Sequence, residues 1–233
     1  MAAAGCAMWS KSGPPTTFHV RIENIAEDTV LRSSTGATAR VAIGPTLWVV
    51  HTRPAPFFSE GQPDRGEGLE ALAEDGDPSR LAAALQGKPG IVSVGTVDLA
   101  VGRVSGAAMP TSSYGPLLPG AAYEFTIVAA RGDRLSIASM FGQSNDLFYA
   151  PREAGIALFT KGEPVRGDVT AHLVLWDAGT EVNEEPGFGP NQAPRQPRPN
   201  TGPREHGVVR PVNDGFVYPP ITKVLRLTIT PRP

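Results

Sequence analysis

Four carboxylates lie within one ten-residue stretch, 176–185, which directly follows an apolar run that predicts a buried strand. Carboxylates this close repel one another unless a cation or a proton separates them. Gly179 lies between Asp177 and Glu181, so the backbone can bend and bring both side chains to one point. Oxygen ligands at the end of a strand suggest a Ca²⁺ site, and a solvated acidic loop is the alternative.

A second stretch, 136–148, is also an apolar strand that ends in a turn with a carboxylate, Asp146. Asn145 is expected to shape this turn through its side chain, as asparagine does in Asx-turns. The sequence thus contains two strand ends that each present an acidic group.

The acidic stretch does not have the spacing of an EF-hand. The twelfth position counted from Asp177 is Phe188, where an EF-hand loop has a bidentate glutamate. The remaining polar residues of the stretch, Asn183, Glu184 and Glu185, are expected to be solvated, with a second acidic contact as the alternative.

The segments 140–148 and 176–185 resemble the two signature segments of the spondin domain. This domain is the N-terminal module of F-spondin and mindin, and it also occurs alone in many bacterial exported proteins. The resemblance extends over roughly 18–230, and further segments that agree with it are 47–51, 57–61, 68–76, 119–120 and 219–224.

This resemblance implies an all-β fold, an antiparallel C2-like β-sandwich with one or two short helices in loops. In the family a single Ca²⁺ is bound by carboxylates whose positions match Asp146, Asp177 and Glu181. Animal members usually have aspartate where this chain has Glu181, and the longer side chain can still reach an ion. Backbone carbonyls and water are expected to complete the ion's about 6–8 oxygen ligands.

The resemblance also implies a non-catalytic recognition or adhesion module at a cell surface or in an extracellular matrix. Its partner would be a protein or a glycan. The alternative is a structural subunit that self-associates, with 186–203 or the N-terminal tail bridging neighbouring copies. No basic segment followed by an apolar one is visible at the N-terminus, so the expected extracellular location rests on the resemblance.

Composition favours a β protein with many turns. The chain has 233 residues, and its 26 glycines and 24 prolines make up about a fifth of them, against roughly 12% in an average protein. The net charge of -2 and the absence of basic runs argue against nucleic acid as a partner. Cys6 is the single cysteine, so no intramolecular disulfide can form. The longest uncharged stretch, 104–123, is too polar and too interrupted to span a bilayer.

We expect a tail over 1–15 and one sandwich domain over 16–233. Apolar and polar residues alternate in several short segments, which predicts half-buried strands; these segments are 18–22, 123–127 and 225–230. One helical stretch is expected over 68–86, in which Asp77 can cap, Pro78 fits the first helical turn and Gly87 can end the helix. Six prolines between 186 and 203 exclude a strand in a sheet interior and predict a long extended loop or a cover over an edge strand.

No enzyme motif is recognisable: the chain has no nucleophile elbow, zincin helix or phosphate-binding loop. The histidines are scattered and are expected to be ordinary strand or loop residues: His19, His51, His172 and His206. A carboxylate pair such as Asp146 with Asp177 could serve a glycosidase, and this is the remaining catalytic alternative.

Two further motifs carry weaker indications. The Arg-Gly-Asp triplet at 131–133 is expected to form a strand-joining turn rather than an integrin motif, because glycine suits such a turn. Four arginines in or near the proline-rich loop are expected to be solvated, with an acidic partner as the alternative: Arg195, Arg198, Arg204 and Arg210.

Overall fold

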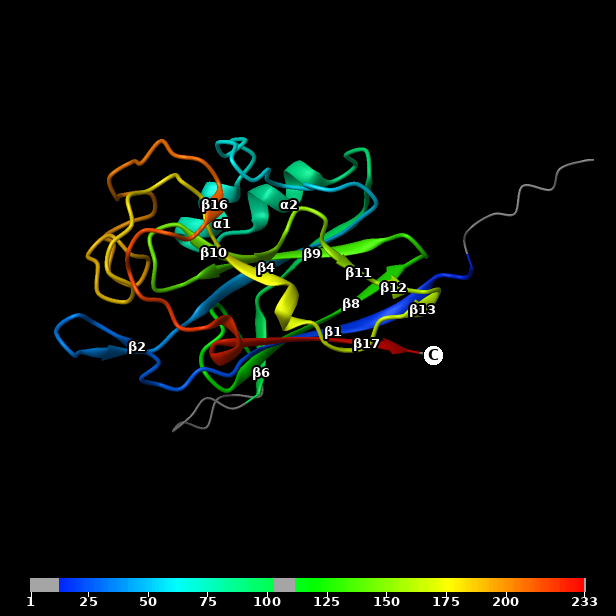
Figure 1. Cartoon of the computed structure of the whole chain (residues 1–233), viewed down its shortest axis with the longest axis horizontal. Helices are drawn as coiled ribbons and strands as arrows, with labels where there is room; N and C mark the ends of the chain where they lie inside the picture. The colour runs from blue at the N-terminus through cyan, green and yellow to red at the C-terminus, as the bar shows by residue number, and fades with distance from the viewer. Residues whose placement is uncertain (1–12, 103–111, 233) are drawn as a thin grey trace, which may run out of the picture.

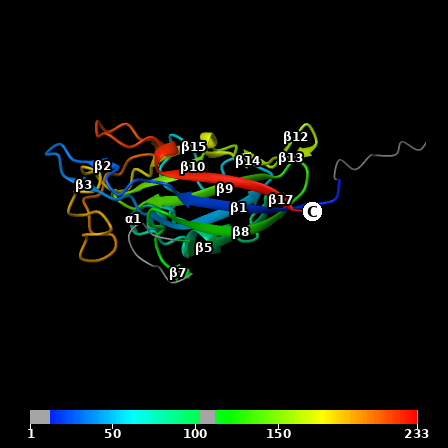
Figure 2. The same ribbon diagram turned by 90° about the horizontal axis from the view of Figure 1, so that it is seen from below.

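The chain folds into a sandwich of two antiparallel sheets, which lie face to face in the computed structural model (Figures 1 and 2). The structure describes residues 13–102 and 112–232. The predicted all-β antiparallel sandwich with short helices is therefore confirmed. Most of the expected tail over 1–15, including Cys6, lies outside the described residues.

The first sheet has the strand order β14-β17-β1-β8-β6-β7. Its strands in chain order are β1 (Thr16–Asn24), β6 (Leu99–Gly102), β7 (Ser112–Tyr114), β8 (Ala121–Ala129), β14 (Gly167–Asp168) and β17 (Leu225–Arg232). The N-terminal and C-terminal strands of the described domain thus pair with each other, from Thr17 opposite Arg232 to Asn24 opposite Leu225.

The second sheet has the order β16-β15-β10-β9-β4-β5, and β11 also pairs with β9. Its strands are β4 (Ile43–His51), β5 (Ile91–Val97), β9 (Arg134–Phe141), β10 (Leu147–Pro151), β11 (Ile156–Ala157), β15 (Leu173–Asp177) and β16 (Arg210–Pro211). Two small ribbons complete the strands: β2 (Leu31–Arg32) with β3 (Thr38–Ala39), and β12 (Phe159–Thr160) with β13 (Glu163–Pro164).

The alternation seen in the sequence determines which strand faces form the core between the sheets. In β1, Phe18, Val20 and Ile22 are buried, while the residues between them are partly exposed. The first residues of β17 repeat this pattern from the neighbouring position in the sheet. By contrast, β9 is buried at every position after its first residue, because both of its faces are covered.

Two short helices cover the outer face of this sheet: α1 (Leu69–Asp75) lies on β9, and α2 (Ser79–Leu85) lies on β4 and β5. The single helical stretch expected over 68–86 is therefore wrong. Gly76 adopts a left-handed conformation, with φ of 70°, which ends α1. Asp77 then accepts a hydrogen bond from the Ser79 N–H at 2.9 Å, as a residue that initiates α2. Apolar residues of both helices pack into a second core with the outer face of the sheet, and its members include Leu69, Leu72, Leu81, Leu85, Phe148 and Trp176.

The proline-rich segment 186–203 contains no strand, as predicted. It is tied to α1 by a hydrogen bond of 2.8 Å from Gln196 Nε2 to Asp75 Oδ1.

The Arg-Gly-Asp triplet forms the turn between β8 and β9, also as predicted, and Asp133 accepts the Ala130 N–H at 2.8 Å. The short 3₁₀ helices η1 (Thr170–His172) and η2 (Ile221–Lys223) precede β15 and β17. None of the helices in the described part of the chain is both long and apolar enough to cross a membrane.

Candidate metal centre

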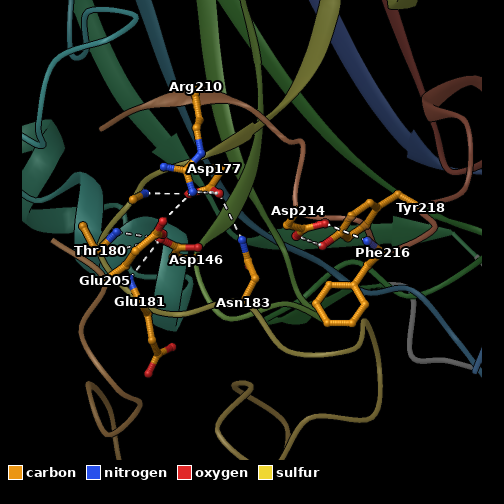
Figure 3. Close-up of polar contacts among 11 residues, drawn as sticks. Asp146, Asp177, Thr180, Glu181, Asn183, Glu205, Arg210, Asp214, Phe216 and Tyr218 are labelled. Carbon is orange, nitrogen blue, oxygen red and sulfur yellow. Dashed lines mark hydrogen bonds and ion pairs between the residues drawn. The ribbon is translucent and has the colours of Figure 1, made fainter. Parts of the chain in front are cut away.

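Sheet pairing brings the two predicted strand ends together. β10 and β15 are antiparallel neighbours, and their register places Leu147 opposite Asp177. Asp146 directly precedes β10, so its carboxylate lies beside that of Asp177 at one edge of the sheet (Figure 3). Both residues are fully buried, at 0% exposure. The sequence expectation that the two turns meet is thus met by the geometry.

Asp146 receives hydrogen bonds on one oxygen only. Its Oδ2 accepts the backbone N–H groups of Thr180, at 2.7 Å, and Glu181, at 3.1 Å, together with the Thr180 hydroxyl at 3.2 Å. Its Oδ1 is buried and has no hydrogen-bond partner among the described residues. Burial, reinforced by the charge of Asp177, raises the pKa of Asp146 to about 7. The site therefore contains a buried carboxylate with a free ligand atom.

Asp177 is held in a tight turn. Its Oδ1 accepts the Gly179 N–H at 2.7 Å, and its Oδ2 accepts Asn183 Nδ2 at 3.0 Å. Gly179 is required here, because its φ is 70° and a side chain would bring Cβ within 2.6 Å of the Val208 nitrogen. Burial raises the pKa of Asp177, and the charge of Arg210 opposes that increase.

The third carboxylate of the cluster is Glu205. One oxygen from each of Asp146, Asp177 and Glu205 lies within 4.8 Å of the others. Glu205 reaches the cluster because its loop runs along the acidic turn: the Glu205 N–H donates to the Thr180 carbonyl at 3.0 Å. Oε2 of Glu205 is buried and, like Oδ1 of Asp146, has no partner among the described residues.

Glu181, the third ligand expected from the resemblance, has its carboxylate elsewhere. It contributes its backbone N–H to Asp146, while its side chain points away from the cluster (Figure 3). The carboxylate packs directly against Gly202. Burial raises the pKa of Glu181, and the Asn145 side chain and the Gly202 backbone N–H oppose that increase. Glu205 occupies the place in the cluster that the sequence analysis assigned to Glu181.

Arg210 also belongs to the cluster, although the sequence predicted a solvated side chain. Its guanidinium group donates to Asp177 Oδ2 at 2.9 Å and to Glu205 Oε1 at 2.5 Å. These contacts raise the pKa of Arg210, the hydrogen bond to Glu205 most of all. No sequence pattern marks Glu205 or Arg210, since Glu205 lies in a loop and Arg210 begins β16, a strand of only two residues, which is too short to show periodicity.

The residues expected to be solvated are instead engaged in the loop network. Asn183 binds Asp177, and Glu184 accepts the Asn191 N–H at 2.9 Å. Asn145 binds the acidic stretch instead of forming an Asx-turn: its Oδ1 accepts the Glu184 N–H at 3.0 Å. These bonds join the turn after β9 to the acidic stretch and rigidify the surroundings of the carboxylates. The hydroxyl of Ser144 bonds within the turn, where it accepts the Leu147 N–H at 3.1 Å.

The donor set fits Ca²⁺. Asp146 Oδ1, Glu205 Oε2 and Asn183 Oδ1 are buried oxygens that lack a hydrogen-bond partner within the described chain. Such orphaned acceptors cost free energy unless a cation, a proton or water satisfies them. All are oxygen atoms, the ligand type that Ca²⁺ prefers, and they adjoin the fully buried Asp177. Arg210 offsets one of the three negative charges of these carboxylates, and a divalent cation would balance the two negative charges that remain.

A further acidic residue, Glu74 of α1, lies close to this network and is only 4% exposed. Burial raises its pKa to about 8, a hydrogen bond to Thr180 opposes this, and the charge of Glu181 adds to the increase. Glu74 is therefore largely protonated at neutral pH and does not add a full charge to the cluster.

The histidine best placed for chemistry is a core residue. His51 Nε2 lies 2.9 Å from Ser136 Oγ, and His51 Nδ1 lies 2.5 Å from the Arg53 carbonyl oxygen. Both side chains are buried, at 0% and 2% exposure, and burial lowers the pKa of His51. The contact between His51 and Ser136 is a hydrogen bond between strands β4 and β9, which agrees with the predicted place of His51 in a strand.

Comparison with known proteins assigns the chain to no family: no protein-family model matches it, and no curated protein matches it.

Proposed function

We propose that this protein is a non-catalytic Ca²⁺-binding recognition or adhesion module. The observation that carries the proposal is the pair of unpartnered buried oxygens, Asp146 Oδ1 and Glu205 Oε2, beside the fully buried Asp177. Asp146, Asp177 and Glu205 would hold the ion, and Asn183 Oδ1 is a fourth candidate ligand. The resemblance to the spondin domain agrees for two of these positions.

The proposed ion has a structural role. Its ligands come from three segments that are distant in sequence: the turn before β10, the turn after β15 and the loop before β16. When bound, Ca²⁺ supplies positive charge that offsets the mutual repulsion of the carboxylates. The three loops then stay together and keep the end of the sandwich in one shape.

A catalytic role is disfavoured by burial. Asp146 and Asp177 have no exposed surface, so a glycan or an ester cannot approach their carboxylates without rearrangement of the loops. The location at a cell surface or in a matrix comes from the resemblance to the spondin family. A rigid end of a β-sandwich, carrying loops for recognition, is compatible with that location.

Thermal unfolding of metal-stripped protein with Ca²⁺ or Mg²⁺ tests the proposal. We expect a melting temperature that rises with Ca²⁺ and rises much less with Mg²⁺, because binding to the folded state alone stabilises it. Asp177→Asn should lose this increase. The matched control is Glu163→Gln, which neutralises an exposed carboxylate in β13. An equal Ca²⁺ response of wild type and Asp177→Asn would refute the ion site.

A further inference from the structure

A groove lies beside the β2–β3 hairpin. It has a volume of about 740 Å³, and its walls come from 25–32 on one side and from 217–226 on the other. The hairpin lies at the same end of the molecule as the loops of the acidic site (Figures 1 and 2). The groove therefore forms part of the loop-bearing end that the proposed function assigns to recognition.

The rim of the groove is cationic. Arg32, Lys223 and Arg226 line it, and Glu27 is its one carboxylate. Arg226 is 3.8 Å from Glu23, which partly offsets its charge. Among the residues that the structure describes, neither Arg32 nor Lys223 forms an ion pair. This positive rim stands out on a chain whose net charge is -2, and it complements an anionic partner.

The surface between these charges is largely apolar. Val217 is 86% exposed and lines the groove together with Leu31 and Pro219. The loop that carries Val217 is anchored on both sides: Asp214 accepts the Phe216 N–H at 3.0 Å and the Tyr218 hydroxyl at 2.5 Å. The exposed valine is therefore presented by a fixed loop, and covering it would remove apolar surface from water.

The hairpin also offers unpaired backbone groups. The Ser33 N–H donates to the Ala37 carbonyl at 2.8 Å, and Arg32 pairs with Thr38 in the adjacent position of the ribbon. Hydrogen-bonded and non-hydrogen-bonded pairs alternate along an antiparallel ribbon. The N–H and C=O of Arg32 therefore point away from β3, toward the free edge of β2, where an extended strand can pair.

We infer that this groove binds an extended peptide segment of a partner protein, one that alternates carboxylate and apolar side chains. Arg32 and Lys223 bind the carboxylates, Val217 and Pro219 contact the apolar side chains, and the edge of β2 pairs with the peptide backbone. The inference names the partner class for the recognition role proposed above and rests on that role, although its contacts do not involve the ion.

The apolar side chains of this peptide distinguish it from other anionic partners that could bind the cationic rim. A sulfated glycan presents hydroxyl and sulfate groups throughout and leaves Val217 exposed. A peptide with both kinds of side chain satisfies the charges, the valine and the strand edge together, because it presents carboxylates, apolar groups and backbone hydrogen-bonding groups in one chain. The order of affinities among matched probes therefore decides the assignment.

Fluorescence polarisation with four labelled probes tests the groove. The probes are eight-residue peptides that alternate valine with glutamate, serine or lysine, and a heparin octasaccharide. We expect the Glu–Val peptide to bind, at an affinity that falls with salt, and the Ser–Val and Lys–Val peptides to bind at least about tenfold more weakly. Arg32→Glu combined with Lys223→Glu should weaken the Glu–Val peptide by at least about tenfold. Val217→Ser should weaken it by severalfold.

The control makes the same change of charge at the other end of the molecule. Lys161→Glu combined with Arg166→Glu, at two exposed positions around the β12–β13 ribbon, should leave the affinity unchanged. Two results overturn the inference: no binding of the Glu–Val peptide, or equal binding to the groove variant and the control. Heparin that binds more tightly than the peptide and loses affinity in the groove variant also overturns it, in favour of a glycan.

The same proteins separate this inference from the ion site. The groove variant should keep the rise of melting temperature with Ca²⁺, because none of its substitutions touches the carboxylate cluster. Peptide binding that fails while this Ca²⁺ response persists refutes the groove alone. A missing Ca²⁺ response with intact peptide binding refutes the ion and leaves the groove assignment standing.

Discussion

Asp146 and Asp177 lie side by side because β10 begins where its neighbour β15 ends. Leu147 pairs with Asp177, and the Ala178 N–H donates to the Asp146 carbonyl at 3.2 Å. The backbone thus fixes the approach of the two carboxylates before any side-chain contact is made. Two fully buried acids held in this way store repulsion, which a cation or a proton relieves.

The first prediction concerns the charge of Asp146. Asp146→Asn should abolish the Ca²⁺-induced rise in melting temperature, because it removes a proposed ligand. In metal-free buffer at pH 8 the same variant should be more stable than wild type, by on the order of 2 kcal/mol, because burial of an ionised carboxylate is avoided. Urea unfolding with and without Ca²⁺ measures both effects.

The combination of these two effects is the informative result. A residue with a merely structural hydrogen-bonding role would destabilise the protein in both buffers when substituted. Destabilisation of Asp146→Asn in metal-free buffer at pH 8 would therefore contradict a cluster strained by its own charge.

The second prediction concerns the internal cation. Arg210→Gln removes the guanidinium group that binds Asp177 and Glu205, and leaves their charges uncompensated. We expect the metal-free protein to lose about 3 kcal/mol of stability. We also expect tighter Ca²⁺ binding by titration calorimetry, because a competing positive charge has been removed.

Arg198→Gln, a substitution at an exposed arginine of the proline-rich loop, provides the matched control and should change neither quantity. Weaker Ca²⁺ binding in Arg210→Gln would show that Arg210 positions the ligands rather than competing with the ion.

The sandwich itself could be predicted where one strand face is buried. The alternating residues of β1 and β17 indicate both their extended conformation and their inner faces. β9 lacks such alternation, because α1 covers its second face, and a strand buried on both faces shows no period of two. The break between the helices depends on the left-handed Gly76, whereas the sequence signals at Asp77 and Pro78 indicate only where the second helix begins.

The site was partly predictable for a related reason. Asp146 and Asp177 each follow an apolar strand, and this is a local feature of the sequence. Glu205 comes from a distant loop whose position depends on backbone pairing, such as the bridge between Glu181 and Arg204. The Glu181 backbone N–H faces Asp146, and its side chain is directed to Gly202.

The third prediction separates these two glutamates. Glu205→Gln should weaken Ca²⁺ binding by at least about tenfold, because ligand charge determines the affinity of such sites. Glu181→Gln should stay within roughly threefold of wild type, because its carboxylate lies against Gly202. Titration calorimetry of both variants, made in the same buffer, measures the difference.

Each variant is the control for the other, since both neutralise one glutamate of the same loop region. The opposite order of affinities, with Glu181→Gln the weaker binder, would restore the ligand set that the family resemblance implies. It would also require the loops to rearrange when the ion binds.

The fourth prediction concerns Glu74, whose pKa burial raises to about 8. In an unfolded chain a glutamate titrates near about 4.3. The folded state therefore binds an extra proton between these values, so the stability that depends on it is present at low pH and is lost as the pH rises through about 8. Glu74→Gln should remove this loss and stabilise the protein at pH 9 by on the order of 3 kcal/mol.

The measurement is urea unfolding at pH 5, 7 and 9 in saturating Ca²⁺, which keeps the carboxylates of the proposed ion site ionised throughout. Wild type and the exposed-site control Glu163→Gln should lose stability in parallel between pH 5 and 9, whereas Glu74→Gln should lose much less. Parallel curves for all three proteins would mean that Glu74 is ionised within the fold. In that case the ionised carboxylate of Glu74 would add a negative charge to the surroundings of Thr180 and Glu181.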